Sequence, residues 1–220
     1  MLNLRTAIVL ATVHRLTRSI LLVLSERRTE AGPLRSGLTF YLRPSSGMRT
    51  LLKIGGSILI CLILLLLTVR ITGFEPRGCA TVSGWTCRMP GLWLRGDLVT
   101  TPVTDWSFTD KYPSIKIQTR TWYLLPHSVT AYCIAANGHL YVGSFYWPGL
   151  PPFPHGRAWN ENVARDPHVR LKIGNQLYDR TLVVVTDPAE QAAVTQAGEK
   201  KYPKDRIPPG AKVWHYRVMP

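Results

Sequence analysis

The sequence predicts a mainly β protein, a small β-barrel with α-helical additions that lies behind one N-terminal transmembrane helix. Two observations carry this prediction. An apolar run between Lys53 and Arg70 holds no charged residue, and from residue 103 onward short strand patterns alternate with turn signals. With 220 residues the chain can form one real core, and it is too short for two large catalytic domains.

We divide the chain into a basic leader (residues 1–50), a transmembrane signal-anchor (51–71), an irregular linker (72–102) and the barrel domain (103–220). The sequence from Met48 has the form of a complete signal-anchor start, so we hypothesise that translation begins there. Residues 7–24 are either an amphipathic surface helix or a weak second membrane span.

Residues 51–71 would extend about 31 Å as a helix, which matches a hydrocarbon core of roughly 30 Å. A buried core helix is the alternative, and the apolar residues on every face of this segment disfavour it. No small-residue cleavage pattern follows the run, so we expect a retained anchor.

The net charge of +14 is divided evenly between two parts of the chain. Residues 1–53 hold nine Arg or Lys against two Glu, which is half of the net charge. The positive-inside rule therefore predicts a single-pass protein of a bacterial inner (plasma) membrane, with a cytoplasmic N-terminus and a periplasmic or extracytoplasmic barrel. A nucleic-acid partner is disfavoured because the basic residues are not gathered on the folded domain.

The linker is rich in Gly, Pro and Trp and contains Cys79 and Cys87. These two cysteines would form a disulfide in an oxidising periplasm or remain free thiols in the cytosol. Two cysteines are too few ligands for a zinc site, so we predict no metal.

Strand patterns within the barrel domain cover residues 114–120, 127–136, 139–144, 168–173, 176–186 and 211–218. Asn137-Gly138 is a strong hairpin signal, and Gly174-Asn175 marks a second turn. A short helix is expected over residues 158–165. A longer one begins after Asp187 as N-cap, with Pro188 at its first position, and ends before Pro203.

Several residues of the barrel domain allow more than one interpretation. Cations at Lys116, Arg120, Arg170 and Lys172 form either an anion-binding stripe, if their strands are neighbours, or a solvated strand face. The aromatic loop of residues 145–157 could cover a planar ring, form a dimer contact or touch the membrane surface. We expect Cys133 in the core and an Asx or capping turn over residues 105–110.

The order of motifs in the barrel domain resembles that of a known superfamily. The motifs are Thr119-Arg120, the Asn-Gly hairpin, Gly143-Ser144, Trp159-x-x-Asn162-Val163, Asp166-Pro167-x-Val169 and Asp187-Pro188-Ala-Glu190. Over residues 113–203 the chain resembles the FMN-binding split β-barrel superfamily (pyridoxamine phosphate oxidase-like). It looks closest to the deazaflavin-dependent nitroreductase and quinone reductase branch.

The resemblance implies a split barrel that holds FMN or a deazaflavin in a groove, often between two subunits, with the phosphate on basic and hydroxyl groups. The candidate cofactor-binding residues are the matching Arg120, Thr121, Ser144, Trp159 and Asn162, together with His127, which could hydrogen-bond a flavin edge or be structural. No catalytic residue is predicted.

Two functions follow from these observations. The first is a membrane-anchored flavin- or deazaflavin-dependent oxidoreductase-like protein, a homodimer that reduces a nitro compound or a lipid-soluble acceptor such as a quinone. The second is a non-catalytic split-barrel module that binds a planar or anionic ligand or a protein partner. The second arises because residues 119–124 replace the Gly-Arg-x-Ser-Gly phosphate loop of the resembling branch.

Overall fold

The computed structural model describes residues 46–76, 89–203 and 209–220. The chain divides into two compact units, residues 1–72 and residues 73–220. The predictions for residues 7–24 and for Cys79 and Cys87 lie outside the described residues.

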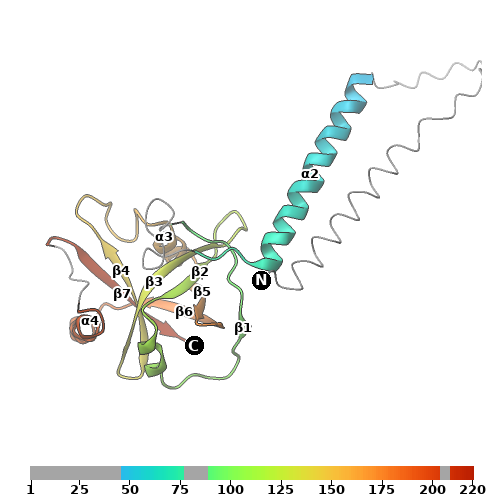
Figure 1. The fold of residues 1–220 in the computed structure, drawn as a ribbon. Coiled ribbons are helices and arrows are strands. Elements are labelled where there is room, and N and C mark those ends of the chain that lie inside the picture. The colour runs from blue at the N-terminus through green and yellow to red at the C-terminus, as the bar shows by residue number, and fades with distance from the viewer. Residues whose placement is uncertain (1–45, 77–88, 204–208) are drawn as a thin grey trace, which may run out of the picture. The chain divides into compact units, whose positions relative to one another are not determined.

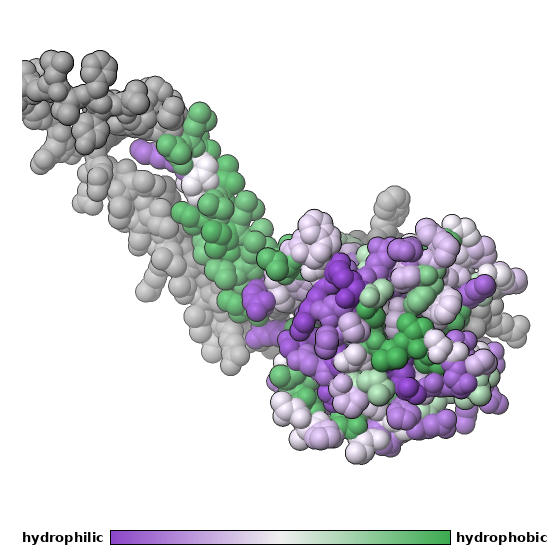
Figure 2. Space-filling model, turned by 180° about the vertical axis from the view of Figure 1, so that it is seen from behind, coloured by the Kyte–Doolittle hydropathy of each residue, from purple (hydrophilic) through white to green (hydrophobic). Residues whose placement is uncertain are grey.

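The helix of the first unit, α2, runs from Ser46 to Thr72 and confirms the apolar helix expected over 51–71. Its portion from Thr50 to Thr72 is long and apolar enough to cross a membrane, and none of its most apolar window is buried by the protein. Figure 2 shows this helix covered by hydrophobic side chains, whereas the face of the barrel seen there is mostly hydrophilic with a smaller hydrophobic patch.

The second unit is a closed barrel of six antiparallel strands with one added strand (Figure 1). The barrel strands are β2 (Ile115–Thr119), β3 (His127–Ala136), β4 (His139–Tyr146), β5 (His168–Ile173), β6 (Gln176–Val184) and β7 (Lys212–Met219). They follow the order β6-β5-β2-β3-β4-β7, and pairing of β6 with β7 closes the ring. The added strand β1 (Asp97–Leu98) pairs in parallel with β6. The predicted mainly β barrel with helical additions is therefore confirmed.

Along each strand, successive side chains point alternately to the inside and to the outside of the barrel. Ile115 and Ile117 of β2 point into the main core, which also contains Leu171 and Tyr216 from other strands. The residues between them in the sequence, such as Lys116, point outward. The expected burial of Cys133 is confirmed, since its side chain is fully buried in this core.

Helix α4 (Pro188–Lys201) covers part of the outer surface of the barrel and forms a second core with it. Its Val194 packs with Ile134 of β3 and Tyr141 of β4. The expected N-cap is confirmed, because the Asp187 carboxylate accepts a hydrogen bond of 2.8 Å from the backbone N–H of Glu190. Helix α3 (Ala158–Arg165) has the predicted bounds.

A 3-10 helix, η3 (Ser107–Lys111), precedes β2 and was not predicted as an element. The expected Asx turn leads into it, since Asp105 Oδ1 accepts a hydrogen bond of 2.9 Å from the Ser107 N–H. Trp106 enters the core, where its ring lies 5.3 Å from that of Tyr178. Burial of this tryptophan fixes the segment that leads into the barrel.

Residues 73–76, which we call the strap, follow α2 directly in the sequence and belong to the barrel unit. The Phe74 N–H donates to Trp93 O over 3.0 Å, and residue 91 exchanges two backbone hydrogen bonds with Ser128 of β3. Gly91 is required there, because a Cβ atom at this position would clash with backbone atoms of Phe74 and Pro76. Part of the sequence expected to be an irregular linker is thus bonded to the barrel.

Candidate functional site

A groove of about 390 Å³ lies on the outside of the barrel between α4 and strands β3, β4 and β7. This volume falls within the range of small-molecule sites, roughly 300–1,000 Å³. The lining residues are Tyr132, Ile134, Gly143, Phe145, Thr195, Gly198, Glu199, Tyr202, Pro203, Val213 and His215.

Gly143 forms the floor of the groove, between Tyr132 on β3 and His215 on β7 in the strand register. A Cβ atom at residue 143 would meet only ordinary van der Waals contacts, the nearest at 3.8 Å from Val213. The fold therefore does not demand glycine at this position. What the glycine provides is an open floor, on which a flat ring can lie against the backbone.

Aromatic rings form one wall of the groove. The Tyr132 ring lies 5.3 Å from that of Phe145 and 4.9 Å from that of Tyr202, both edge to face. Such rings offer apolar faces and edges to a planar ligand. The Tyr202 hydroxyl donates to Cys133 O over 2.7 Å, which fixes the Tyr202 ring at the end of α4.

His215 brings a polar group to the floor. Its side chain is almost fully buried, and burial lowers its pKa below the ordinary value of 6.5. At neutral pH the imidazole is therefore uncharged, with one nitrogen that can donate and one that can accept a hydrogen bond.

The described lining residues carry one carboxylate, Glu199, and no lysine or arginine. A phosphate in the groove would thus lack a cationic partner among these residues. The strongest features of the groove are its aromatic wall, its glycine floor and its neutral histidine.

The predicted cation stripe exists geometrically, but its charges are paired within the chain. Strands β2 and β5 are neighbours, and Lys116 lies directly opposite Lys172. Both ammonium groups contact the Glu75 carboxylate of the strap. Burial raises the Glu75 pKa, but hydrogen bonds and charges from the two lysines outweigh this effect and hold the pKa below its usual value.

The other two cations of the stripe also have acidic partners. Arg170 binds Asp179 through two hydrogen bonds of 2.7 and 2.8 Å, and Arg120 lies 3.3 Å from Asp166. The chain itself therefore supplies the anions of this face.

Ser144 and Trp159, two of the predicted cofactor residues, face the inside of the barrel. The buried Ser144 hydroxyl accepts a hydrogen bond of 2.8 Å from Asn160 Nδ2, which also donates to the Tyr146 hydroxyl. The Trp159 ring packs 5.4 Å from that of Tyr216 in the main core.

The structure brings Arg120 and Asn162 together where β2 ends. The Arg165 guanidinium donates to Arg120 O over 2.6 Å and to Asn162 Oδ1 over 3.2 Å. Asn162 Nδ2 in turn donates to Thr119 Oγ1, which lies opposite His127 in the register.

Thr121 lies in the loop between β2 and β3, and His127 begins β3 directly after this loop. The Thr121 hydroxyl donates to Leu125 O within this loop. His127 is half-buried, and burial lowers its pKa. None of the six predicted residues lines the α4 groove, so their role in cofactor binding stays a prediction.

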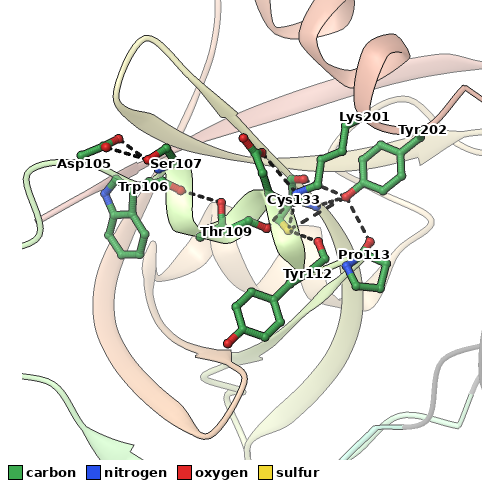
Figure 3. A network of polar contacts seen from close by, with 10 residues as sticks. Asp105, Trp106, Ser107, Thr109, Tyr112, Pro113, Cys133, Lys201 and Tyr202 are labelled. Carbon is green, nitrogen blue, oxygen red and sulfur yellow. Dashed lines mark hydrogen bonds and ion pairs between the residues drawn. The ribbon is translucent and has the colours of Figure 1, made fainter.

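A polar network around Cys133 joins η3, β3 and the end of α4 (Figure 3). Lys201 Nζ donates to Thr109 O over 3.0 Å and lies 3.4 Å from Cys133 Sγ. Burial raises the pKa of the Cys133 thiol more than the Lys201 charge lowers it. This cysteine is a protonated core residue and not a nucleophile.

The aromatic loop of residues 145–157 closes over the barrel with Phe153. The Phe153 ring stacks on that of Trp214 at 4.4 Å, and the Tyr146 hydroxyl donates to Pro154 O. Trp147, in contrast, is exposed.

A search of solved structures found chains that resemble this one at low sequence identity. A candidate pyridoxamine 5′-phosphate oxidase from Listeria innocua shares 12% identity over 52% of this chain and 88% of its own, with a TM-score of 0.38. A NimC/NimA family protein from Clostridium acetobutylicum shares 9% identity over 50% of this chain and 76% of its own, with a TM-score of 0.37. An F420-H2 dependent reductase shares 18% identity over 49% of this chain and 94% of its own, with a TM-score of 0.36. Family models and curated proteins gave no match.

The groove residues were missed at the sequence level because nothing in their local pattern marks them. Tyr132, Tyr202 and His215 come from segments that are distant in the sequence and meet only when the barrel closes. One signal was present, since a glycine inside a strand, such as Gly143, often marks a close approach of a ligand to the backbone.

Proposed function

We propose that the barrel binds the tricyclic ring of a flavin or deazaflavin in the α4 groove and acts as an oxidoreductase. The observation that carries this proposal is the open floor at Gly143, between the aromatic wall and the neutral His215. The bound ring would supply the hydride chemistry. The chain would hold the ring against the wall formed by Tyr132, Phe145 and Tyr202 and offer the His215 imidazole as a hydrogen-bond partner.

The described lining of the groove fits the ring better than it fits the phosphate of FMN. The described lining provides apolar area and no cation, and the four cations of the predicted stripe already bind Glu75, Asp166 and Asp179. We therefore propose recognition through the ring, with the phosphate contributing little.

The same pairing of cations favours a second candidate function. A barrel that binds a planar ligand without a phosphate and without turnover needs the groove and no further machinery. Reduction of a quinone or nitro compound by the loaded protein would distinguish the enzyme from this binding module.

We further propose that α2 spans a membrane as a single anchor, with the N-terminus cytoplasmic and the barrel on the opposite side. An anchored barrel would meet a lipid-soluble acceptor such as a quinone at a raised effective concentration. We also propose that the protein forms a homodimer, as the resemblance to split β-barrel proteins implies. A C-terminal reporter active only outside the cytoplasm tests the orientation.

Binding of riboflavin, FMN and a deazaflavin to the full chain in detergent tests the ring site. We expect saturable binding, with the affinity for riboflavin within about tenfold of that for FMN, because the ring supplies the contacts. A phosphate held by charged groups would instead add hydrogen bonds worth about 1.5–3 kcal/mol and make FMN bind more tightly. FMN binding more than tenfold tighter than riboflavin would contradict ring recognition, and binding of none of the three would end the proposal.

Gly143→Leu supplies the matched variant, since it fills the floor of the groove without a backbone clash. His139→Leu adds the same side chain at an exposed position of the same strand, outside the groove. We expect Gly143→Leu to weaken riboflavin binding at least tenfold and His139→Leu to leave it unchanged. Equal binding by both variants would place the ring elsewhere.

A further inference from the structure

The loop between β2 and β3, residues 120–126, exposes three large hydrophobic side chains in succession. Trp122 is 78% exposed, Tyr123 49% and Leu124 94%. A lone exposed hydrophobic residue is ordinary, but three at the tip of one loop form a patch that calls for a partner.

The loop holds these side chains outward by its own backbone. Leu124 has a φ of 68°, in the left-handed region that a leucine rarely adopts. The Leu125 N–H donates to Tyr123 O over 2.9 Å, and the Thr121 hydroxyl donates to Leu125 O. The exposure is therefore built into the turn.

The composition of the loop fits the interface of a lipid bilayer. Tryptophan and tyrosine concentrate at the headgroup level of membranes, where a leucine beside them can enter the acyl region. Arg120, whose side chain is 73% exposed, begins the loop, and Arg165 is bonded to its carbonyl. Positive charge at the base of the loop favours the headgroup region of an anionic bilayer, and the contact of Arg120 with Asp166 offsets part of that charge.

Backbone hydrogen bonds place this loop at the end of the barrel to which the strap is bonded. The strap begins at Gly73, directly after α2, and its Phe74 pairs with Leu92 and Trp93. The neighbouring Gly91 pairs with Ser128, two residues after the loop ends. Within the barrel unit, two sets of backbone hydrogen bonds thus link the strap, which follows α2 in the sequence, to the strand that begins after the loop.

We propose that Trp122, Tyr123 and Leu124 insert into the interface of the bilayer that α2 spans and hold this end of the barrel against the lipid. The proposal rests on the proposed membrane span and is independent of the ring site. Insertion of the three side chains would also bring Arg120, which contacts Asp166 over 3.3 Å, to the level of the lipid headgroups.

An environment-sensitive fluorophore at residue 124 tests the insertion. The full chain carrying Leu124→Cys, with Cys61, Cys79 and Cys87 replaced by Ser, is labelled and reconstituted into phosphatidylcholine–phosphatidylglycerol vesicles. The matched control is His139→Cys in the same background, an exposed position at the start of β4, opposite Ala136 at the end of β3 that lies away from the loop. We expect a blue-shifted emission at 124, quenched by nitroxide lipids, and a water-like emission at 139 without quenching.

Three outcomes would overturn the insertion. One is a water-like emission at 124 in chains that float with the vesicles, which leaves the span and the ring site untouched. Another is a blue shift at 124 without quenching by lipid nitroxides, which indicates a protein partner or a second copy. The third is equal quenching at 124 and 139, which shows no preference for the loop.

Discussion

At the scale of single residues, the proposed site depends on a glycine, which has no side chain, and on an uncharged histidine. Gly143 keeps the floor of the groove open, and His215 is buried beside it in its neutral form. Neither residue belongs to a recognisable catalytic motif. Both are defined by their register across β4 and β7, which a linear pattern does not contain.

Burial of His215 predicts a dependence of stability on pH. Because the pKa of His215 is lowered in the folded chain, the unfolded chain binds more protons below about pH 6.5, and stability falls as the pH decreases from there. His127 acts in the same direction. Urea unfolding between pH 7.5 and 5.5 should show a smaller loss for His215→Asn than for the wild type. Equal losses would contradict a neutral buried His215.

The buried Cys133 thiol should resist alkylation. Its raised pKa and its full burial both keep the reactive thiolate away from reagent. We expect iodoacetamide at pH 8, followed by peptide mass spectrometry, to label residue 133 only after addition of denaturant. Rapid labelling in the folded chain would contradict its place in the core.

At the scale of elements, local sequence pattern predicts the strands and helices well and the strap and β1 poorly. Strand β3 and helix α3 have the predicted bounds, because alternation, an Asn-Gly turn and Asp166-Pro167 specify them locally. The strap is fixed by Glu75, whose lysine partners lie 41 and 97 residues away in the sequence. No local pattern indicates such pairings.

Loss of the Glu75 carboxylate should destabilise the barrel unit. Glu75→Gln would leave Lys116 opposite Lys172 without an anion, at a cost of about 1–2 kcal/mol for a partly exposed site. Urea unfolding at pH 7, followed by tryptophan fluorescence, measures this change. Glu199→Gln, an exposed glutamate with the same change of charge, is the control and should have little effect.

The effect of Glu75→Gln should itself depend on pH. The Glu75 pKa is lowered in the folded chain, so the carboxylate stabilises the fold above about pH 4.5 and this contribution disappears as the pH falls through the folded pKa. The difference between the wild type and Glu75→Gln should therefore shrink in acid. A difference that is constant from pH 7 to pH 3 would show that the ion pairs contribute nothing.

Removal of the α4 N-cap should weaken the helix that forms one side of the groove. Asp187→Ala deletes the acceptor of the Glu190 N–H and should cost about 1 kcal/mol. Asp187→Asn keeps an acceptor and should retain most of the stability. If both substitutions cost the same, the charge and not the hydrogen bond is responsible.

At the scale of the whole molecule, sequence analysis predicts the fold class and leaves the binding surface open. The apolar helix and the barrel follow from hydropathy and strand alternation, and the structure confirms both. Two surfaces now compete for a flavin-type ring. One is the α4 groove, and the other is the end of β2 with its loop, where Arg120, Thr121 and His127 lie. The remaining motif residues, Ser144, Trp159 and Asn162, are buried.

Amide hydrogen exchange of the full chain with and without riboflavin decides most directly between these two surfaces. The proposed site predicts slower exchange on binding in β4 around Gly143, in β7 around His215 and at the end of α4. Slower exchange confined to residues 119–128 and 158–165, with no change at Gly143 and His215, would contradict it.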